Sequence, residues 1–293
     1  MKKIVSLILI AVLGCLTLVA CAPADKDYSL ALVVDTAATA TGKVTNTAAA
    51  IVFDKDGKIV SARFDSAEIA PTAVGGVLEA VPTVETKVEQ GDSYGGDNPM
   101  PAGSWEKQTK AFEDAIVGKT ADEAANLDMT LVSGCTMKST VPVFKALIKK
   151  AAAAAKYDFK TSGDIALGLA ISMKSIAGGK VQADYAATVV ADEKLVACTI
   201  DSNEVPFTIN EDDTITAGEY VGTKTEQGDN YVMPAGNWAK QAAAFTGAII
   251  GKNAEELEAF EPVSDALAAA GCTMQNTTAG YKATIIKAFG YAK

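Results

Sequence analysis

Residues 224–252 read KTEQGDNYVMPAGNWAKQAAAFTGAIIGK, and residues 87–119 read KVEQGDSYGGDNPMPAGSWEKQTKAFEDAIVGK. The two stretches are copies of one segment, and the first copy carries a short insert. Gly-Cys-Thr-Met recurs after each copy and Asp-Ser before each, so the repeat extends in both directions. Each copy is about 130 residues long, a usual domain size that can bury its own core. The sequence therefore predicts two homologous domains, residues 27–156 and 161–293, joined by a linker near residues 156–163.

The first twenty residues have the features of a secretory signal. Two lysines precede an apolar run over residues 4–18, and no acid occurs before Asp25. The run ends in Leu-Val-Ala-Cys at Cys21, which resembles the lipobox of bacterial lipoproteins. That resemblance implies a signal helix at residues 1–20 and a lipid on Cys21. We therefore expect a lipid-anchored protein on the extracellular face of the cytoplasmic membrane.

Composition excludes several classes of function. Loss of the two signal lysines takes the formal charge from −10 to −12, which argues against nucleic acid as a partner. The chain has no histidine, which excludes Ser-His-Asp catalysis and His-ligated metals, and we expect no metal site. Besides Cys21, the mature chain has three cysteines, Cys135, Cys198 and Cys272. An odd number predicts no disulfide framework, and unpaired cysteines in an exported protein indicate a reducing habitat.

The expected elements are strands first and helices afterwards in each copy. Strands are predicted over residues 28–35 and 78–84, with hairpins over residues 48–65 and 187–201. Helices are predicted to begin after Ser104, Asn237, Thr120 and Asn253, and to span residues 141–155 and 278–292. This order predicts an α+β fold in which each domain packs a small antiparallel sheet against two or three helices.

A glycine turn rich in hydroxyl groups precedes the last helix of each copy. Such a turn offers unpaired N–H groups at a helix start, where a phosphate or another anion can bind. The alternative is that its hydroxyls only cap the helix. The candidate residues are Ser133, Gly134, Cys135, Thr136, Ser139 and Thr140 in the first copy and Gly271, Cys272, Thr273, Thr277 and Thr278 in the second.

The order of these elements resembles the FMN-binding domain of sodium-pumping quinone reductases and of Gram-positive electron-transfer lipoproteins. The matching motifs are Asp-Gly-Lys-Ile at residues 56–59, Ser-Gly-Cys-Thr at residues 133–136 and Gly-Cys-Thr at residues 271–273. The resemblance implies FMN at the two turns and outward electron transfer to a redox partner. Lys138 and Gln275 stand where that family has the hydroxyl that carries FMN, so these are divergent copies.

The best-retained segment offers a second candidate site. Two carboxylates beside tyrosine and tryptophan can form a pocket for a planar or sugar-like ligand. The alternative is a structural loop in which each tryptophan anchors a helix in the core. The residues are Glu89, Asp92, Tyr94 and Trp105 in the first copy and Glu226, Asp229, Tyr231 and Trp238 in the second.

Three functions follow from these patterns. The first is a lipid-anchored flavin electron carrier. The second is a non-catalytic surface module that binds a small ligand or a wall polymer, and the third is a structural or interaction lipoprotein without a cofactor. A binding or carrier protein is favoured over an enzyme, because an acid pair such as Glu226 and Asp229 is weak support for glycosidase chemistry or calcium binding.

Overall fold

The computed structural model describes residues 24–94, 100–234, 236–274 and 278–292. The first repeat contains β1 (Lys26–Ala38), β2 (Val44–Asp54), β3 (Ile59–Ile69), β4 (Ala73–Val74), β5 (Val77–Leu78), α2 (Lys87–Gln90), η1 (Gly91–Ser93), α3 (Trp105–Ile116), α4 (Ala121–Ala125), η2 (Met129–Leu131) and α5 (Val141–Ala153). After β6 (Tyr157–Thr161), the second repeat contains β7 (Ala166–Ile176), β8 (Lys180–Ala191), β9 (Lys194–Ile209), β10 (Ile215–Ala217), α6 (Lys224–Gln227), η3 (Gly228–Asn230), β11 (Val232–Met233), β12 (Gly236–Asn237), α7 (Trp238–Gly247), α8 (Ala254–Ala259), α9 (Asp265–Ala269) and α10 (Thr278–Tyr291).

Two four-stranded antiparallel sheets organise the molecule. Their strand orders are β3-β2-β1-β6 and β10-β9-β8-β7. The predicted α+β class with antiparallel sheets is therefore confirmed. The predicted linker forms β6 instead, because its residues pair with residues 26–30 of β1 and extend the first sheet.

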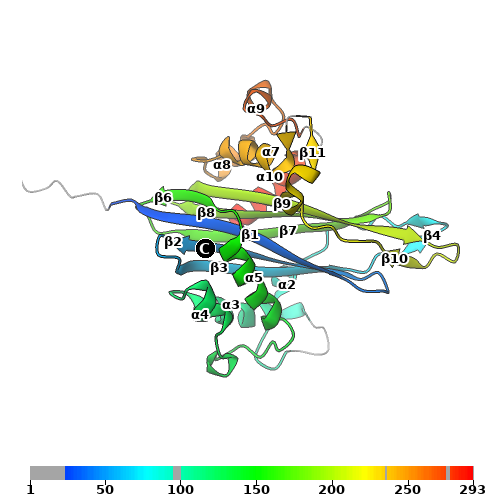
Figure 1. Cartoon of the computed structure of the whole chain (residues 1–293), viewed down its shortest axis with the longest axis horizontal. Coiled ribbons are helices and arrows are strands. Elements are labelled where there is room, and N and C mark those ends of the chain that lie inside the picture. The colour runs from blue at the N-terminus through cyan, green and yellow to red at the C-terminus, as the bar shows by residue number, and fades with distance from the viewer. Residues whose placement is uncertain (1–23, 95–99, 235, 275–277, 293) are drawn as a thin grey trace, which may run out of the picture.

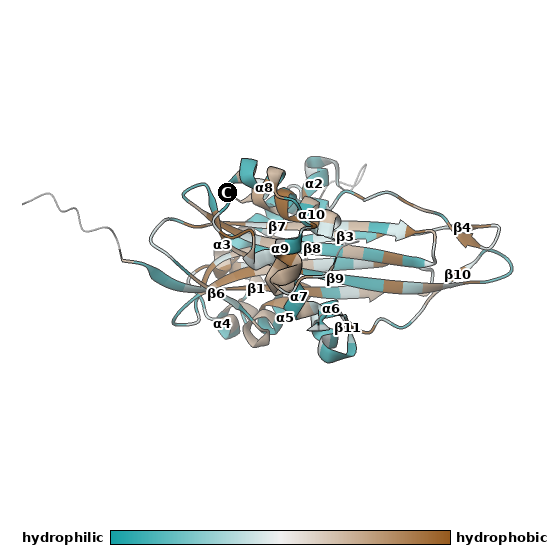
Figure 2. Ribbon diagram, turned by 90° about the horizontal axis from the view of Figure 1, so that it is seen from above, coloured by the Kyte–Doolittle hydropathy of each residue, from teal (hydrophilic) through white to brown (hydrophobic). Residues whose placement is uncertain are grey.

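The two sheets pack face to face, and helices cover their outer faces (Figure 1). Viewed at a right angle, the strands run along the long axis and the helices gather over their middle (Figure 2). Leu30 and Val34 of β1 lie between the sheets, whereas Ala31 and Val33 contact the helical layer. A strand buried on both faces needs apolar residues at almost every position, which explains the run YSLALVVD.

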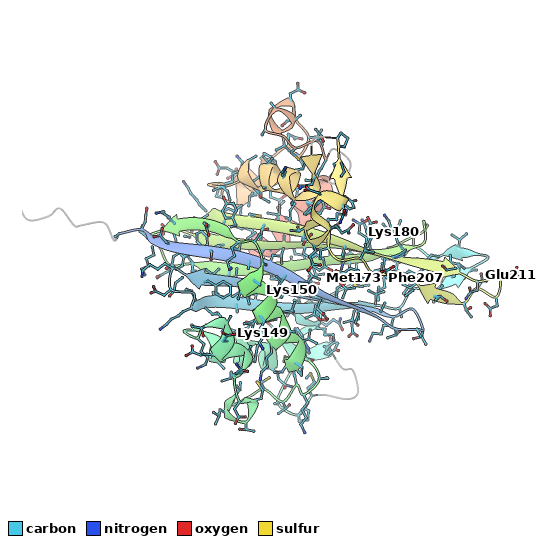
Figure 3. All side chains as sticks on the ribbon, viewed as in Figure 1. Lys149, Lys150, Met173, Lys180, Phe207 and Glu211 are labelled. Atoms are coloured by element: carbon cyan, nitrogen blue, oxygen red, sulfur yellow. The ribbon has the colours of Figure 1, made fainter. Side chains whose placement is uncertain are left out.

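The core between the sheets contains residues from both repeats. Leu30 and Val52 of the first repeat pack there with Ile171 and Met173 of the second, and Met173 is labelled in Figure 3. A second core lies under α3 and α5, and a third lies under α7 and α10. Each repeat buries one face of its sheet only against the other repeat. The division into two domains therefore stays a prediction.

Most local expectations agree with the structure. Ser104 and Asn237 accept hydrogen bonds from the backbone at the starts of α3 and α7, and Thr120 and Asn253 form capping boxes at α4 and α8. The strand expected over residues 78–84 is wrong. Only Val77–Leu78 forms a short strand there, and Val84 makes a single bridge to Met173.

Three expectations lie outside the described residues. These are the signal helix at residues 1–20, the lipid on Cys21, and the role of Thr277. Among the described residues, no helix combines the length and apolar character needed to cross a membrane.

Candidate functional site

The best-retained segment begins with one turn of helix, α2 in the first repeat and α6 in the second. Thr86 caps α2: its hydroxyl accepts from the Glu89 N–H at 3.2 Å, and the Glu89 carboxylate accepts from the Thr86 N–H at 2.8 Å. Thr223 and Glu226 repeat this capping box at 3.2 and 2.9 Å. The glutamates proposed as pocket residues therefore hold the start of a helix.

A buried aspartate supports each of these turns. Asp65 Oδ1 accepts from the N–H groups of Ser66 at 2.7 Å and Val88 at 3.2 Å. Asp201 makes the equivalent bonds in the second repeat. Burial raises the pKa of Asp65 to about 7 and that of Asp201 to about 6, although these N–H donors oppose the rise. Both repeats share this arrangement, in which the aspartate holds the backbone at the start of the helical turn.

The aromatic residues of the segment surround a buried lysine. Lys87 Nζ lies 2.7 Å from a Glu68 carboxylate oxygen, 5.1 Å from the Tyr94 ring centroid and 5.9 Å from the Trp105 ring centroid. In the second repeat, Lys224 Nζ lies 5.3 Å from the Tyr231 ring centroid. These are cation–π distances, so each ring stabilises the chain's own lysine.

The two tryptophans are core residues. Trp105 is 2% exposed and Trp238 is 1% exposed. Asp92 forms an exposed ion pair with Lys107 at 2.9 Å, and Asp229 accepts from the Asn237 side chain at 2.7 Å. The geometry therefore favours the structural alternative for the segment.

The glutamates of the segment also join the two repeats. Glu89 pairs with Lys287 of α10 and accepts from the Tyr291 hydroxyl at 2.7 Å. Glu226 pairs with Lys150 of α5, which Figure 3 labels. The two ion pairs occupy equivalent positions, so each repeat ties its first helical turn to the last helix of the other.

The glycine turns before α5 and α10 are held from within. Gln108 Oε1 accepts from the N–H of Thr136 at 2.7 Å and from its hydroxyl at 3.0 Å. Gln241 holds Thr273 in the same way at 2.8 and 2.9 Å. Thr140 precedes α5, but its side chain makes no capping bond, so the capping alternative is wrong at this residue.

The remaining flavin candidates shape the same turns. Gly134 and Gly271 have φ of +83° and +98°, which favours glycine, and Cys135 and Cys272 are buried. Ser133 and Ser139 are exposed, and Thr278 begins α10. A hollow beside Cys272 measures about 10 Å³, whereas ligand pockets are roughly 300–1,000 Å³. The flavin candidates are thus brought together as two turns, one before α5 and one before α10.

A larger hollow lies where the two repeats meet on the outer face of β3. We call it the junction groove, and its volume is about 520 Å³. The first repeat contributes residues 63–65 of β3, Val88, and both exposed and buried residues of α3. The second repeat contributes Leu169 of β7 and Tyr291 of α10. None of the eight loop residues predicted as a ligand pocket lines this groove.

An ion pair lies at the wall of the groove. Arg63 is the sole arginine of the chain, and its Nη1 donates to Glu113 Oε2 at 2.9 Å. Arg63 Nε also donates to the Leu167 carbonyl at 3.2 Å, and the Phe64 N–H donates to Glu113 Oε1 at 2.8 Å. Burial raises the pKa of Glu113 to about 7, against the opposing effect of Arg63. Perturbed carboxyl groups in clefts are typical of functional sites.

Thr109 is a buried residue in the wall of the groove, and it is 2% exposed. Its hydroxyl oxygen has less than 1 Å² of accessible surface and no hydrogen-bond partner within the described part of the chain. The hydroxyl therefore lies beneath the surface of the groove, where a molecule in the groove does not reach it.

The second repeat lacks these side chains. Alignment of the copies places small or uncharged residues opposite the groove residues Arg63, Glu106, Thr109, Lys110, Glu113 and Tyr291. Their counterparts are Thr199, Ala239, Ala242, Ala243, Thr246 and Ala154. The groove chemistry thus belongs to one junction only.

Sequence reasoning missed the junction groove, although two signals pointed to it. One is the sole arginine, and the other is the set of charged residues that α3 carries and α7 lacks. What no sequence signal supplied was the approach of Leu169 and Tyr291, which lie more than a hundred residues from Arg63 along the chain.

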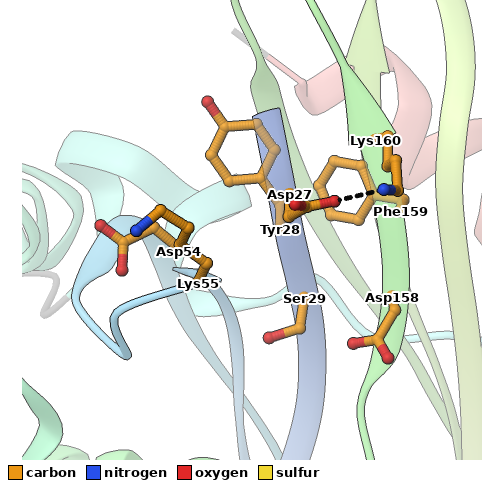
Figure 4. Close-up of a pocket in the computed structure, with 8 residues that line it drawn as sticks. All are labelled: Asp27, Tyr28, Ser29, Asp54, Lys55, Asp158, Phe159 and Lys160. Carbon is orange, nitrogen blue, oxygen red and sulfur yellow. Dashed lines mark ion pairs between the residues drawn. The ribbon is translucent and has the colours of Figure 1, made fainter. Parts of the chain in front are cut away.

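A second hollow of about 510 Å³ lies at the end of β1 and β6 (Figure 4). Asp27 and Lys160 form an ion pair across it at 2.8 Å, and the rings of Tyr28 and Phe159 stack at 5.4 Å. Its charged side chains are exposed except for Asp54, which is half-buried, and among the described residues none of its lining atoms is a buried polar atom without a partner. It is the weaker candidate.

Comparison of this chain with protein-family models, with curated proteins and with solved structures gave no match. The resemblance to FMN-binding domains therefore stays a prediction that depends on the motifs alone.

Proposed function

We propose that the protein is a non-catalytic binding protein that takes a small molecule into the junction groove. The observation that carries this proposal is a hollow of about 520 Å³ where the two repeats meet, lined by Glu106, Lys110 and Glu113 of α3, which have no charged counterpart in α7. That volume lies within the usual range for small-molecule sites, roughly 300–1,000 Å³.

The difference between the repeats supports the proposal. Alanine or threonine occupies the matching positions of the second repeat, so that repeat folds without the polar set of the groove. Both oxygens of Glu113 already accept hydrogen bonds, from Arg63 and from the Phe64 N–H. This arrangement fits a fixed binding surface better than a carboxyl group that exchanges protons with a substrate.

We also propose that this binding takes place outside the cytoplasmic membrane. Cys21 precedes the start of β1 at Lys26 by five residues, so a lipid there would hold the sheets close to the membrane surface. A lipid-anchored binding protein of this kind would retain its ligand at the cell surface.

A fragment screen tests the proposal. The mature region, with Cys21 replaced, is mixed with uncharged, anionic and cationic fragments, and methyl NMR follows Val88, Thr109 and Leu169. We expect hits that shift these methyl signals and leave unchanged those of Thr225, the counterpart of Val88 in the second repeat, and of Leu32, the counterpart of Leu169 in the first.

A variant that fills the groove provides the control. Thr109→Phe should abolish the shifts at Val88 and Leu169, whereas Ala242→Ser, at the matching site of the second repeat, should preserve them. A screen in which no fragment perturbs the groove methyls would contradict the proposed function.

The flavin electron carrier is the second candidate, and the Ser-Gly-Cys-Thr motif at residues 133–136 supports it. An absorbance spectrum and an intact mass, after production with a flavin transferase, test it directly. A flavin spectrum with the added mass of FMN would establish the carrier. A colourless protein of unmodified mass that also fails to bind added FMN would leave the groove as the site.

A further inference from the structure

We infer that polar side chains buried between the two sheets make the second repeat pack against the first repeat and not against another copy of itself. The side chains that decide this are Thr36, Asn46 and Asn203. The inference concerns the interface between the repeats and does not depend on the proposed binding function. It names the kind of partner that the inner face of the second sheet accepts.

One amide joins the two sheets. Asn203 of β9 donates from Nδ2 to Thr36 Oγ1 of β1 at 2.7 Å and to Asn46 Oδ1 of β2 at 3.0 Å. The Thr36 hydroxyl donates to Asn46 Oδ1 at 2.7 Å, and Asn46 Nδ2 donates to Met173 Sδ at 3.7 Å. Asn46 is 0% exposed and Asn203 is 1% exposed, so water cannot replace these bonds.

Each sheet carries a matching row of three paired residues, one from each of three long strands. The rows are Thr36, Asn46 and Ala67 in the first sheet and Met173, Ala183 and Asn203 in the second. They are equivalent, because Ala67 and Asn203 each follow the buried aspartate of their repeat by two residues. The first sheet thus has its polar residues on β1 and β2, and the second has its polar residue on β9.

The packing of the repeats brings the polar ends of the two rows together. The ion pairs Glu89–Lys287 and Glu226–Lys150 join equivalent residues in both directions, so an approximate two-fold rotation relates the repeats. Under this rotation β1 lies against β9 and β3 lies against β7. The polar residues of the first row therefore meet Asn203, whereas Ala67 lies on the side of β7.

A second repeat packed in the same way against its own copy would lose this match. Its Asn203 would lie against Met173 of the copy, and its Ala183 would lie against Ala183. The Asn203 amide would then have a weak sulfur acceptor in place of two oxygens. Burial of an amide without its hydrogen bonds is costly, so this pairing is disfavoured.

Two tyrosines make the second repeat more dependent on this match. Burial raises the pKa of Tyr185 and Tyr220, and the nearby Asn203 amide opposes the rise. Asn203 Oδ1 and both phenol hydroxyls lack a hydrogen-bond partner within the described part of the chain. Loss of Thr36 and Asn46 would add the Asn203 N–H groups to this set.

Refolding of the mature region, with Cys21 replaced, tests the inference. Asn203→Ala gives the second row the residue that the first row has at Ala67. The protein is refolded from urea at high concentration, and size-exclusion chromatography measures the fraction of dimer. We expect this fraction to rise about threefold over that of the parent protein, because two second repeats can then pack without a buried amide between them.

Val205→Ala is the matched control. Val205 lies on the same strand and in the same core and is 0% exposed, so its truncation also lowers stability but leaves Asn203 in place. We expect its dimer fraction to equal that of the parent protein. An equal rise in both variants would assign the dimer to lost stability and overturn the inference, and so would the absence of a rise in Asn203→Ala.

A double-mutant cycle tests the bond between the sheets. Asn46→Ala and Asn203→Ala should each lower the midpoint of thermal unfolding by about 4 °C, because each leaves a buried polar group without its partner. The double variant should lose about 5 °C and not about 8 °C, since it removes both sides of the bond. Additive losses would show that the two amides act independently and would also overturn the inference.

Discussion

The two repeats agree where the chain folds and differ where it can bind. Both keep the buried aspartate, the capping box, the lysine beneath its aromatic ring and the glutamine that holds the last turn. Only the first keeps a charged and polar face on its central helix. Retention between copies therefore marks the needs of folding in this protein, and divergence between them marks the candidate site.

The largest expected effect tests the agreement between the repeats. Trp105→Ala and Trp238→Ala should each lower the free energy of unfolding by about 3–5 kcal/mol, because each removes a large buried side chain and leaves a cavity. Urea unfolding followed by circular dichroism measures both. A loss below about 1 kcal/mol, typical of exposed side chains, would show that a tryptophan is not a core anchor.

The next effect tests the difference between the repeats. Glu113→Ala should cost about 3 kcal/mol, because it leaves the Arg63 guanidinium and the Phe64 N–H without the carboxylate. Thr246→Ala at the matching site removes a hydroxyl bonded within its own helix and should cost about 1 kcal/mol. Equal losses of stability in the two variants would show that α3 and α7 do not differ at this position.

A third effect concerns pH. Burial raises the pKa of Asp65 and Glu113 to about 7 and that of Asp201 to about 6. The folded state therefore holds these protons more tightly than the unfolded chain. Stability from the protonated carboxyl groups is present below about pH 4 and is lost as pH rises toward about 7, by up to about 1.4 kcal/mol per pH unit for each group.

Substitution separates the two aspartates. Asp65→Asn keeps an oxygen that accepts the backbone N–H groups and should flatten the fall in stability up to about pH 7. Asp201→Asn should flatten it only up to about pH 6. Urea unfolding at several pH values measures this. If the free energy of unfolding of a variant falls with pH as steeply as that of the parent protein, the substituted carboxyl group does not cause the fall.

The smallest effect concerns the ion pairs between the repeats. Glu226→Gln keeps the capping box but breaks the pair with Lys150, and should cost about 0.5 kcal/mol because both side chains are partly exposed. Glu89→Gln should cost about 1 kcal/mol, since Glu89 is more buried and also accepts from Tyr291. High salt should reduce the effect of Glu226→Gln more strongly than that of Glu89→Gln.

Local structure could be predicted from the sequence because its causes are local. The Asp-Lys-Asp-Gly turn ends β2, and the Thr-x-x-Glu and Asn-x-x-Glu boxes begin α4 and α8, since each depends on residues only a few positions apart. The helical turns at Lys87 and Lys224 were missed, although Thr86 and Thr223 stand three residues before a glutamate in the same way.

The packing of the repeats could not be predicted in the same way. The run YSLALVVD suits any strand buried on both faces, and nothing in it says that the second face lies against another repeat. The junction groove depends on that packing, because Leu169 and Tyr291 line the same hollow as Glu113 only when the sheets stack. The junction groove therefore could not be predicted from repeat patterns that treat each copy as an independent domain.

The shared core also has a consequence for the order of events during folding. The first sheet can form from its own strands, but its inner face, with Leu30, Val34 and Val52, stays uncovered until β7 and β8 dock on it. Such an exposed apolar sheet is prone to aggregate. The folding chain is thus most vulnerable between the formation of the first sheet and the docking of the second, and the yield of folded protein should depend on how short that interval is.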